Sequence, residues 1–310
     1  MNFSHGKLIT ILQYFSRRFQ DYWHILYPDV SFEERESDQF LYFYDISKKA
    51  TDYKGSFDDS GIYLFKGYDG FDHIHALELS QYSLACWLAW RKTNTKYYLD
   101  KALLHCEWLV NNQMKNGSWV IEHKNPSYSD LPSPWPSGMA QGLAISALVR
   151  AYKYTKNIKY LDVACKACDF LELGVANGGV KRDFIINGIE GYIYEEYPRS
   201  KLNGVLNGYI TSILGVYELS IINSKYTAVF NENMKNLNTI LPLYDTGYWS
   251  YYSLDGNIDS GFYHRYIIIQ LTAIESIDSS VSEVKDRFIY YRDSKVSQIK
   301  ALFNKVKYKL

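Results

Sequence analysis

The chain has 310 residues, of which 47% are hydrophobic and 22% are charged, so it can bury a full core and is not globally disordered. Lys and Arg together number 34, and so do Asp and Glu, which makes the formal net charge zero. Nucleic-acid binders normally carry a basic excess, so we expect no nucleic-acid partner. No apolar run approaches the roughly 18 residues that a membrane span needs, so we expect no transmembrane segment.

Residues 1–75 are predicted to form an N-terminal extension that contains a helix and short strands. The apolar stretch Leu8–Phe15 is followed at once by two arginines and lacks a small-residue cleavage site, which is typical of an amphipathic helix rather than a signal peptide. Two aromatic runs, Phe40–Tyr44 and Gly61–Phe65, indicate short β-strands or irregular segments.

The four cysteines all lie in apolar, helix-like sequence. Cys165 and Cys168 form a C-x-x-C pair, but no second pair of ligands follows at the spacing of a zinc site, so no metal ligands are singled out. We therefore expect buried, reduced thiols, and a cytoplasmic location in keeping with them.

From residue 76 onward the sequence repeats, each unit being a helix, a short polar turn and a second helix. The units begin at Gln81, Gln141, Asn207 and His264, which are separated by 60, 66 and 57 residues. The first helix of each unit is apolar nearly all round, whereas the second carries charges on one face, so the first is predicted to be inner and the second outer. The fold class is therefore mainly α, with residues 76–310 forming an (α/α) toroid or incomplete barrel of helical hairpins. An open solenoid is the alternative.

The inner helices are expected to begin near residues 78, 139, 204 and 262. Gln81, Gln141, Asn207 and His264 then occupy equivalent positions at one end of the ring, and we expect them to face one polar cavity and bind substrate. The alternative is that they cap helix ends. Long loops feed this end, and long loops in compact domains are usually functional.

Three clusters in these loops carry side chains suited to acid–base chemistry. They are Tyr192–Pro198, Leu241–Leu254 and Phe262–Tyr266. The chain has no glycine-rich phosphate loop and no H-E-x-x-H motif, and no Ser/His/Asp order is identifiable, so no motif supports acyl transfer.

Over about residues 61–275 the chain resembles the C-terminal domain of the D-glucuronyl C5-epimerases, which convert glucuronate into iduronate within heparosan-type polysaccharides. Four ordered blocks carry the resemblance. They are Met139–Gly142 with Ala144–Ser146 and Leu148–Tyr152; Gly179–Lys181 with Tyr194–Pro198 and Leu206–Gly208; Leu241–Gly247 with Tyr252 and Leu254; and Tyr263–His264.

The resemblance implies an isomerase that removes the C5 proton of a uronate and returns a proton to the opposite face, without a redox cofactor. It places Glu196, Tyr197, Tyr252 and Tyr263 in the catalytic site. We expect Glu196 and Tyr263, which come from different repeats, to form the opposed acid–base pair, and Tyr197 and Tyr252 to support them as hydrogen-bond donors. The implied partner is a uronate-containing glycan, and the oligomeric state is left open.

Two positions depart from the family pattern. Asp255 follows Tyr252–Leu254 where the family typically has an arginine, and Ile267 replaces the family's second histidine. Arg199, Lys201 or Arg265 are candidates to supply the missing positive charge, and we count the two arginines among the substrate-binding residues. Two other functions remain open: a lyase that uses the same C5 carbanion, and a glycan-binding protein without turnover.

Overall fold

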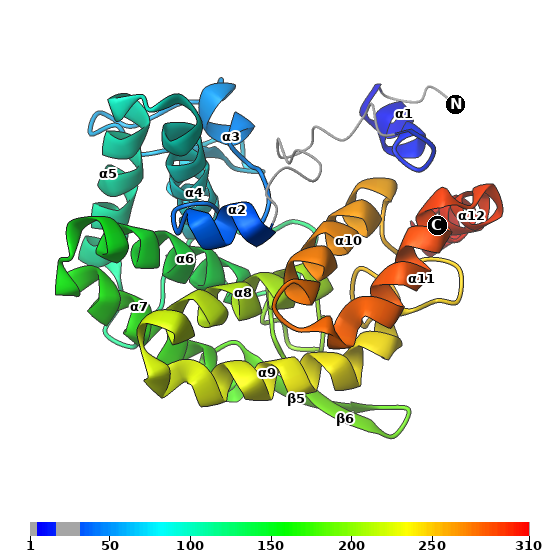
Figure 1. Ribbon diagram of the computed structural model, residues 1–310. Helices are drawn as coiled ribbons and strands as arrows, with labels where there is room; N and C mark the ends of the chain where they lie inside the picture. The colour runs from blue at the N-terminus through cyan, green and yellow to red at the C-terminus, as the bar shows by residue number, and fades with distance from the viewer. Residues whose placement is uncertain (1–4, 17–31, 310) are drawn as a thin grey trace.

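The computed structural model describes residues 5–16 and 32–309, and it is built mainly of α-helices (Figure 1). The helices are α1 (His5–Leu12), α2 (Phe32–Ser37), α3 (Lys48–Thr51), α4 (Ala76–Thr93), α5 (Lys96–Asn112), α6 (Gly138–Thr155), α7 (Ile158–Leu171), α8 (Leu206–Ile222), α9 (Thr227–Ile240), α10 (Gly261–Glu275), α11 (Ser282–Asp293) and α12 (Lys295–Lys309). The strands are β1 (Phe65–Lys66), β2 (Asp72–His73), β3 (Val120–Ile121), β4 (Trp135–Pro136), β5 (Lys181–Ile186) and β6 (Ile189–Tyr194).

Four helical hairpins form the body of the protein, α4/α5, α6/α7, α8/α9 and α10/α11. The first helices of the hairpins pack side by side in the order α4, α6, α8, α10, and their partners lie outside them (Figure 1). Their first residues lie within two positions of the predicted 78, 139, 204 and 262. The mainly α fold of stacked hairpins is therefore confirmed.

The inner helices approach one another closely because glycines lie at their contacts. A Cβ atom built on Gly142 of α6 would lie 2.5 Å from the Cα of Ser212 on α8. One built on Gly215 would lie 2.4 Å from the carbonyl oxygen of Gly142. Only residues without a side chain allow this separation, so α6 and α8, the middle two of the four inner helices, pack tightly against each other.

The described part of the N-terminal extension packs into the same core as the hairpins. The Phe40–Tyr44 run is a buried irregular segment rather than a strand, because Arg150 of α6 donates to the carbonyl oxygens of Phe40 (3.0 Å) and Leu41 (2.6 Å). The hydroxyls of Tyr44 and Tyr266 are 2.7 Å apart, which joins this segment to α10. The strand-like run Gly61–Phe65 leads into β1, which pairs with β2.

Within the described residues, three two-stranded antiparallel sheets lie beside the helices, and two of them lead directly into the loops in front of inner helices. In the β5–β6 hairpin, Lys181 pairs with Tyr194, and the turn is made by Asn187 and Gly188, both with positive φ. In the β3–β4 pair, Ile121 lies opposite Trp135, two residues before the N-cap of α6.

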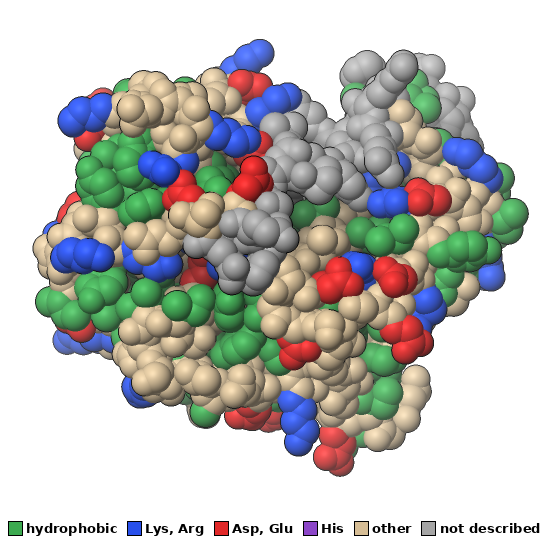
Figure 2. Space-filling model, viewed as in Figure 1, with side chains coloured by type: hydrophobic (Ala, Val, Ile, Leu, Met, Phe, Trp, Pro, Cys, Tyr) green, Lys and Arg blue, Asp and Glu red, His purple; other side chains and the backbone are tan. Residues whose placement is uncertain are grey.

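The four cysteines carry no disulfide; Cys86, Cys106 and Cys168 are buried and Cys165 is partly exposed. Among the described helices, none is long and apolar enough to cross a bilayer. Acidic and basic side chains are interspersed on the face shown in Figure 2, in keeping with the zero net charge.

Candidate active site

The loops that precede α6, α8 and α10 meet at the N-terminal ends of these inner helices. The amide of Gly138, at the start of α6, donates to the carbonyl oxygen of Glu195 (2.8 Å). The amide of Leu206, at the start of α8, donates to the carbonyl oxygen of Tyr252 (3.2 Å), and the amide of Leu254 donates to that of Asn203 (2.9 Å). Residues 195–205 and 250–257 therefore lie side by side in front of the inner helices.

Glu195 stabilises this loop cluster and is fully buried. One carboxylate oxygen accepts the amide of Asn203 (3.0 Å) and the Nε of Arg182 (2.9 Å), and the other accepts the amide of Gly204 (2.9 Å). With these donors around it, Glu195 closes the turn between β6 and α8.

The next residue, Glu196, has a very different environment. Glu196 is only 4% exposed, and Nδ2 of Asn207 donates to its carboxylate from 3.5 Å. Burial raises the pKa of Glu196 to about 7, while hydrogen bonding from Tyr197 and Asn207 acts in the opposite direction. A carboxyl group with this pKa exchanges protons readily near neutral pH, as a general base or acid must.

Three tyrosines, Tyr197, Tyr252 and Tyr263, form a cluster next to Glu196. The rings of Tyr252 and Tyr263 meet edge to face with centroids 4.8 Å apart. Loss of water raises the pKa of Tyr197 and of Tyr252 well above the usual 10, and the charge of Glu196 adds to this effect. Tyr263 also interacts electrostatically with both phenols. The structure thus brings the four predicted catalytic residues together. The phenols of Tyr197 and Tyr252 keep their protons and can act as hydrogen-bond donors, and the roles of all four residues in a reaction remain predictions.

A cavity of about 250 Å³ opens beside Tyr252 and Tyr263. Its walls also include residues from both ends of the chain. Thr10 lies in α1 and Gln13 directly follows that helix, whereas Lys305 lies in α12. Tyr197, Tyr252 and Tyr263 each keep part of their surface exposed, so the cluster is accessible to a ligand.

Sequence reasoning missed two aromatic residues of the cluster. Tyr128, in the loop between β3 and β4, packs on Tyr197 with ring centroids 4.7 Å apart, and Trp135 lies 5.5 Å from the same ring. The guanidinium of Arg199 lies 4.6 Å from the centre of the Tyr128 ring. The length of this loop was the only signal in the sequence, and it did not identify which side chain reaches the site.

The two arginines chosen as substrate ligands lie in different places. Arg199 is beside the cluster, where its Nε donates to Asp130 (2.7 Å) and its Nη1 lies 3.7 Å from Asp255. Asp255, which stands where the family typically has an arginine, is therefore next to Arg199. Arg265 is buried and donates to the carbonyl oxygen of Ser16 (3.2 Å), near the end of α1.

The four polar residues at the repeat starts are all buried, but they have different partners. Asn207 reaches Glu196, whereas Gln81 accepts a hydrogen bond from Lys49 and Gln141 donates to the carbonyl oxygen of Trp119 (3.5 Å). The ring of His264 stacks on Trp249 at 3.7 Å between centroids, so it belongs to the packed core. The expectation of one shared cavity is wrong for His264, because a loop tryptophan covers it.

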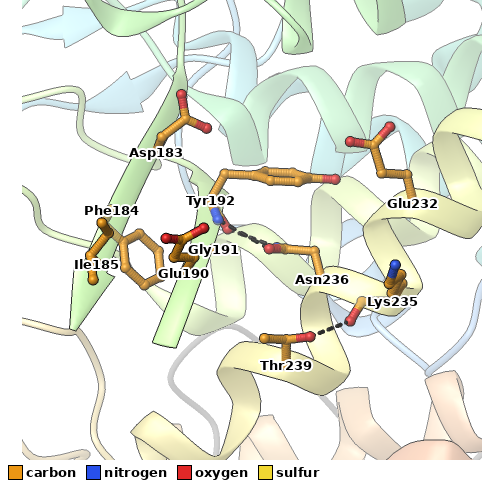
Figure 3. A pocket seen from close by; sticks show the side chains of 10 residues that line it. All are labelled: Asp183, Phe184, Ile185, Glu190, Gly191, Tyr192, Glu232, Lys235, Asn236 and Thr239. Atoms are coloured by element: carbon orange, nitrogen blue, oxygen red, sulfur yellow. Dashed lines mark hydrogen bonds between the residues drawn. The ribbon is translucent and has the colours of Figure 1, made fainter. Parts of the chain in front are cut away.

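A second hollow, of about 660 Å³, lies between the β5–β6 hairpin and α9 (Figure 3). Asn236 fixes the hairpin to α9, since its side chain accepts from the amide of Tyr192 (3.0 Å) and donates to the carbonyl oxygen of the same residue (2.8 Å). Asp183, Glu190 and Glu232 line this hollow, and none of the predicted catalytic residues does. Within residues 5–16 and 32–309, no three His, Cys, Asp or Glu side chains gather as a possible metal site.

The family model described as D-glucuronyl C5-epimerase C-terminus matches residues 111–293. A D-glucuronyl C5-epimerase of Caenorhabditis elegans is 32% identical over 212 residues, which cover 60% of this chain and 34% of the worm protein. An uncharacterized protein of Methanocaldococcus jannaschii is 28% identical over 173 residues, covering 52% of this chain and 56% of that one.

Among solved structures, a family 76 glycoside hydrolase from a bovine Bacteroides thetaiotaomicron strain matches with a TM-score of 0.44 and 16% identity, over 65% of this chain and 42% of that one. The chain spans about a third of the length of the worm relative and just over half of the archaeal one. The family model covers more than half of the chain, and the chain therefore belongs to the D-glucuronyl C5-epimerase C-terminus family.

Proposed function

We propose that the protein inverts C5 of a hexuronate residue within a glycan or glycan precursor, turning glucuronate into iduronate. The observation that carries the proposal is the buried carboxyl group of Glu196, whose pKa is raised to about 7 within a cluster of phenols. Membership of the C5-epimerase family supports the same reaction type.

The chemistry requires two groups that exchange protons on opposite faces of one carbon. The hydrogen at C5 is α to a carboxylate, so its removal leaves an enolate-like anion. In this proposal the Glu196 carboxylate takes the proton, and the Tyr263 hydroxyl donates one to the other face. Glu196 then holds a proton and Tyr263 is a phenolate, and both return to their starting states by exchange with water. No electrons are transferred, so the reaction needs no redox cofactor.

Tyr197 and Tyr252 stabilise the negative charge that develops on the substrate carboxylate. Both phenols interact with Glu196 and with Tyr263, and burial keeps both protonated, so each is available as a hydrogen-bond donor throughout the reaction. Arg199, beside Tyr128, is the candidate for binding the uronate carboxylate from the edge of the cluster. We also propose a cytoplasmic location, on the basis of the buried thiols.

Deuterium incorporation at C5 tests this function. Glucuronate-containing polymers, beginning with heparosan, are incubated with the protein in D₂O, and NMR measures deuterium at C5 and the appearance of iduronate. Glu196→Gln is the control that should lose both signals. Ultraviolet absorbance from a 4,5-unsaturated uronate would identify a lyase instead. Binding to a polymer without exchange would identify a glycan-binding protein.

A further inference from the structure

A chain of three buried polar side chains lies directly behind the tyrosine cluster. Ser250 Oγ is 2.6 Å from Nδ1 of His264 and 2.5 Å from Oδ2 of Asp259, and Nε2 of His264 is 3.0 Å from the carbonyl oxygen of Phe288. Ser250, Asp259 and His264 are all 0% exposed. The serine hydroxyl is therefore sealed from substrate, and a nucleophilic role for this Asp–Ser–His set is excluded.

The three contacts fix the number of protons in the chain. A carbonyl oxygen only accepts, so Nε2 of His264 carries a hydrogen and Nδ1 of a neutral ring must accept from Ser250. The hydroxyl has one hydrogen and has used it, so Oδ2 of Asp259 must donate to Ser250 and carry a proton. The remaining arrangement, an aspartate anion with an imidazolium, contains the same number of protons, so one proton is shared by the pair in either case.

Burial favours the neutral form of this network. It raises the pKa of Asp259 to about 7, against the opposing effects of Ser250 and Lys305, and lowers the pKa of His264 to about 3. The other carboxyl oxygen of Asp259, Oδ1, has no hydrogen-bond partner in the described part of the chain, which suits a neutral acid better than an anion.

Charged and titratable groups face the network from several elements. Lys305 of α12 favours the ionised form of Asp259. Burial, and then the charge of Asp259, raise the pKa of Tyr14, which lies beyond the end of α1, so this phenol stays neutral beside the network. Arg265 of α10 and Arg292 of α11 oppose a positive charge on His264. The positive charges of Lys305 and of the two arginines thus favour loss of the shared proton, against the effect of burial.

The network connects the two backbone segments that carry Tyr252 and Tyr263. Ser250 precedes Tyr252 by two residues, and His264 follows Tyr263 directly. Asp259 adds backbone links, because its amide donates to the carbonyl oxygen of Ser250 (3.0 Å) and its own carbonyl oxygen accepts from the indole of Trp249 (3.2 Å). This chain of hydrogen bonds therefore joins the segment that carries Tyr252 to the start of α10, which carries Tyr263.

We propose that Asp259 is a positioning residue whose shared proton holds the Tyr252 loop against the start of α10, and that loss of this proton at alkaline pH disorganises the tyrosine pair. In the deprotonated chain, the single hydroxyl hydrogen of Ser250 cannot satisfy both the carboxylate and Nδ1 of His264, so one of the two links is lost. This proposal rests on the proposed function for its effect on catalysis, but not for the protonation state itself.

The test compares Asp259→Asn with Asp259→Leu. The asparagine amide donates to Ser250 at every pH, as the protonated carboxyl does, whereas leucine donates at none. We expect wild-type C5 exchange to decline as the pH rises above about 7, and the asparagine variant to keep its rate through that range. The leucine variant should lose about a hundredfold at all pH values, the cost of a misplaced catalytic group. Asp162→Asn, on the exposed face of α7, is the matched control and should keep the wild-type decline.

Two measurements on the protein alone separate a failure of this proposal from a failure of the proposed function. The imidazole ¹⁵N shifts of His264 should show hydrogen on Nε2 and a hydrogen-bonded, bare Nδ1. The folded protein holds the Asp259 proton more tightly than the unfolded chain does, whereas His264 takes up a proton less readily when folded, so the two residues act in opposite directions on the pH dependence of unfolding. The unfolding temperature of the wild type should therefore fall relative to that of Asp259→Asn as the pH rises toward about 7. Hydrogen on Nδ1 alone, identical pH dependence of unfolding in both proteins, or equal activity loss in the asparagine and leucine variants would overturn the proposal, even if no glycan is turned over.

Discussion

Glu195 and Glu196 are adjacent in the chain, yet their carboxylates point into opposite environments. Glu195 accepts three hydrogen bonds, from Arg182, Asn203 and Gly204, at 2.9 to 3.0 Å. Asn207 donates to Glu196 from 3.5 Å, and the other hydrogen-bond partner of this buried carboxyl is the phenol of Tyr197. Successive residues leaving a strand face opposite sides, and β6 ends one residue before this pair. Glu195 is therefore held by the loop, whereas Glu196 is available for the proton transfer that we propose.

Replacing each glutamate by glutamine should separate these two roles. Glu196→Gln should lower the rate of C5 deuterium exchange by about 10² to 10⁴, the usual cost of losing a general base, with little change in unfolding temperature. Glu195→Gln leaves Arg182 without its charged partner and should lower the unfolding temperature instead. Exchange by Glu196→Gln at the wild-type rate would show that another group removes the proton.

The pH dependence of exchange should report the Glu196 carboxyl. The ionised form accepts the C5 proton, and its pKa is about 7, so kcat/KM should rise as the pH increases toward that value. Together with the alkaline decline assigned to Asp259, this gives a bell-shaped profile with its maximum near neutrality. A profile that is flat from about pH 5 to about pH 7 would contradict the assignment of Glu196 as the base.

The sequence was sufficient to predict the hairpins, because an inner helix that is apolar all round cannot be exposed to water. The Glu196 and tyrosine positions came from the family resemblance rather than from periodicity. Tyr128 was missed because its contact with Tyr197 forms only when two loops from different repeats fold together. His264 was assigned to the wrong environment for the same reason, since Trp249 covers it from a loop fifteen residues upstream.

The close approach of α6 and α8 predicts a strong effect of one methyl group. Gly142→Ala should destabilise the protein by about 1 to 3 kcal/mol, because the added Cβ meets the backbone of Ser212 and overpacking outweighs the better helix propensity of alanine. Gly174→Ala is the matched control, since the nearest atoms to its Cβ are 3.9 Å away and its φ is −65°. Chemical denaturation of both variants measures the difference, and equal stabilities would mean that the two helices lie further apart.

Tyr263→Phe tests whether inversion needs a donor from the wall opposite Glu196. Tyr263 begins the helix of a different repeat from the loop that carries Glu196, and Tyr197 and Tyr252 interact with both. Removing its hydroxyl leaves a base on one face of the sugar and no acid on the other.

We therefore expect Tyr263→Phe to abolish the formation of iduronate while still allowing some deuterium exchange at C5. The reason is that Glu196 alone can remove a proton and return a deuteron to the face from which the proton came. NMR of the glucuronate and iduronate signals in the same D₂O sample separates exchange from inversion, and Tyr290→Phe, on the exposed surface of α11, should affect neither. If Tyr263→Phe produces iduronate at the wild-type rate, the opposite-face donor is another group, and Tyr252, whose ring is 4.8 Å away, becomes the first residue to replace.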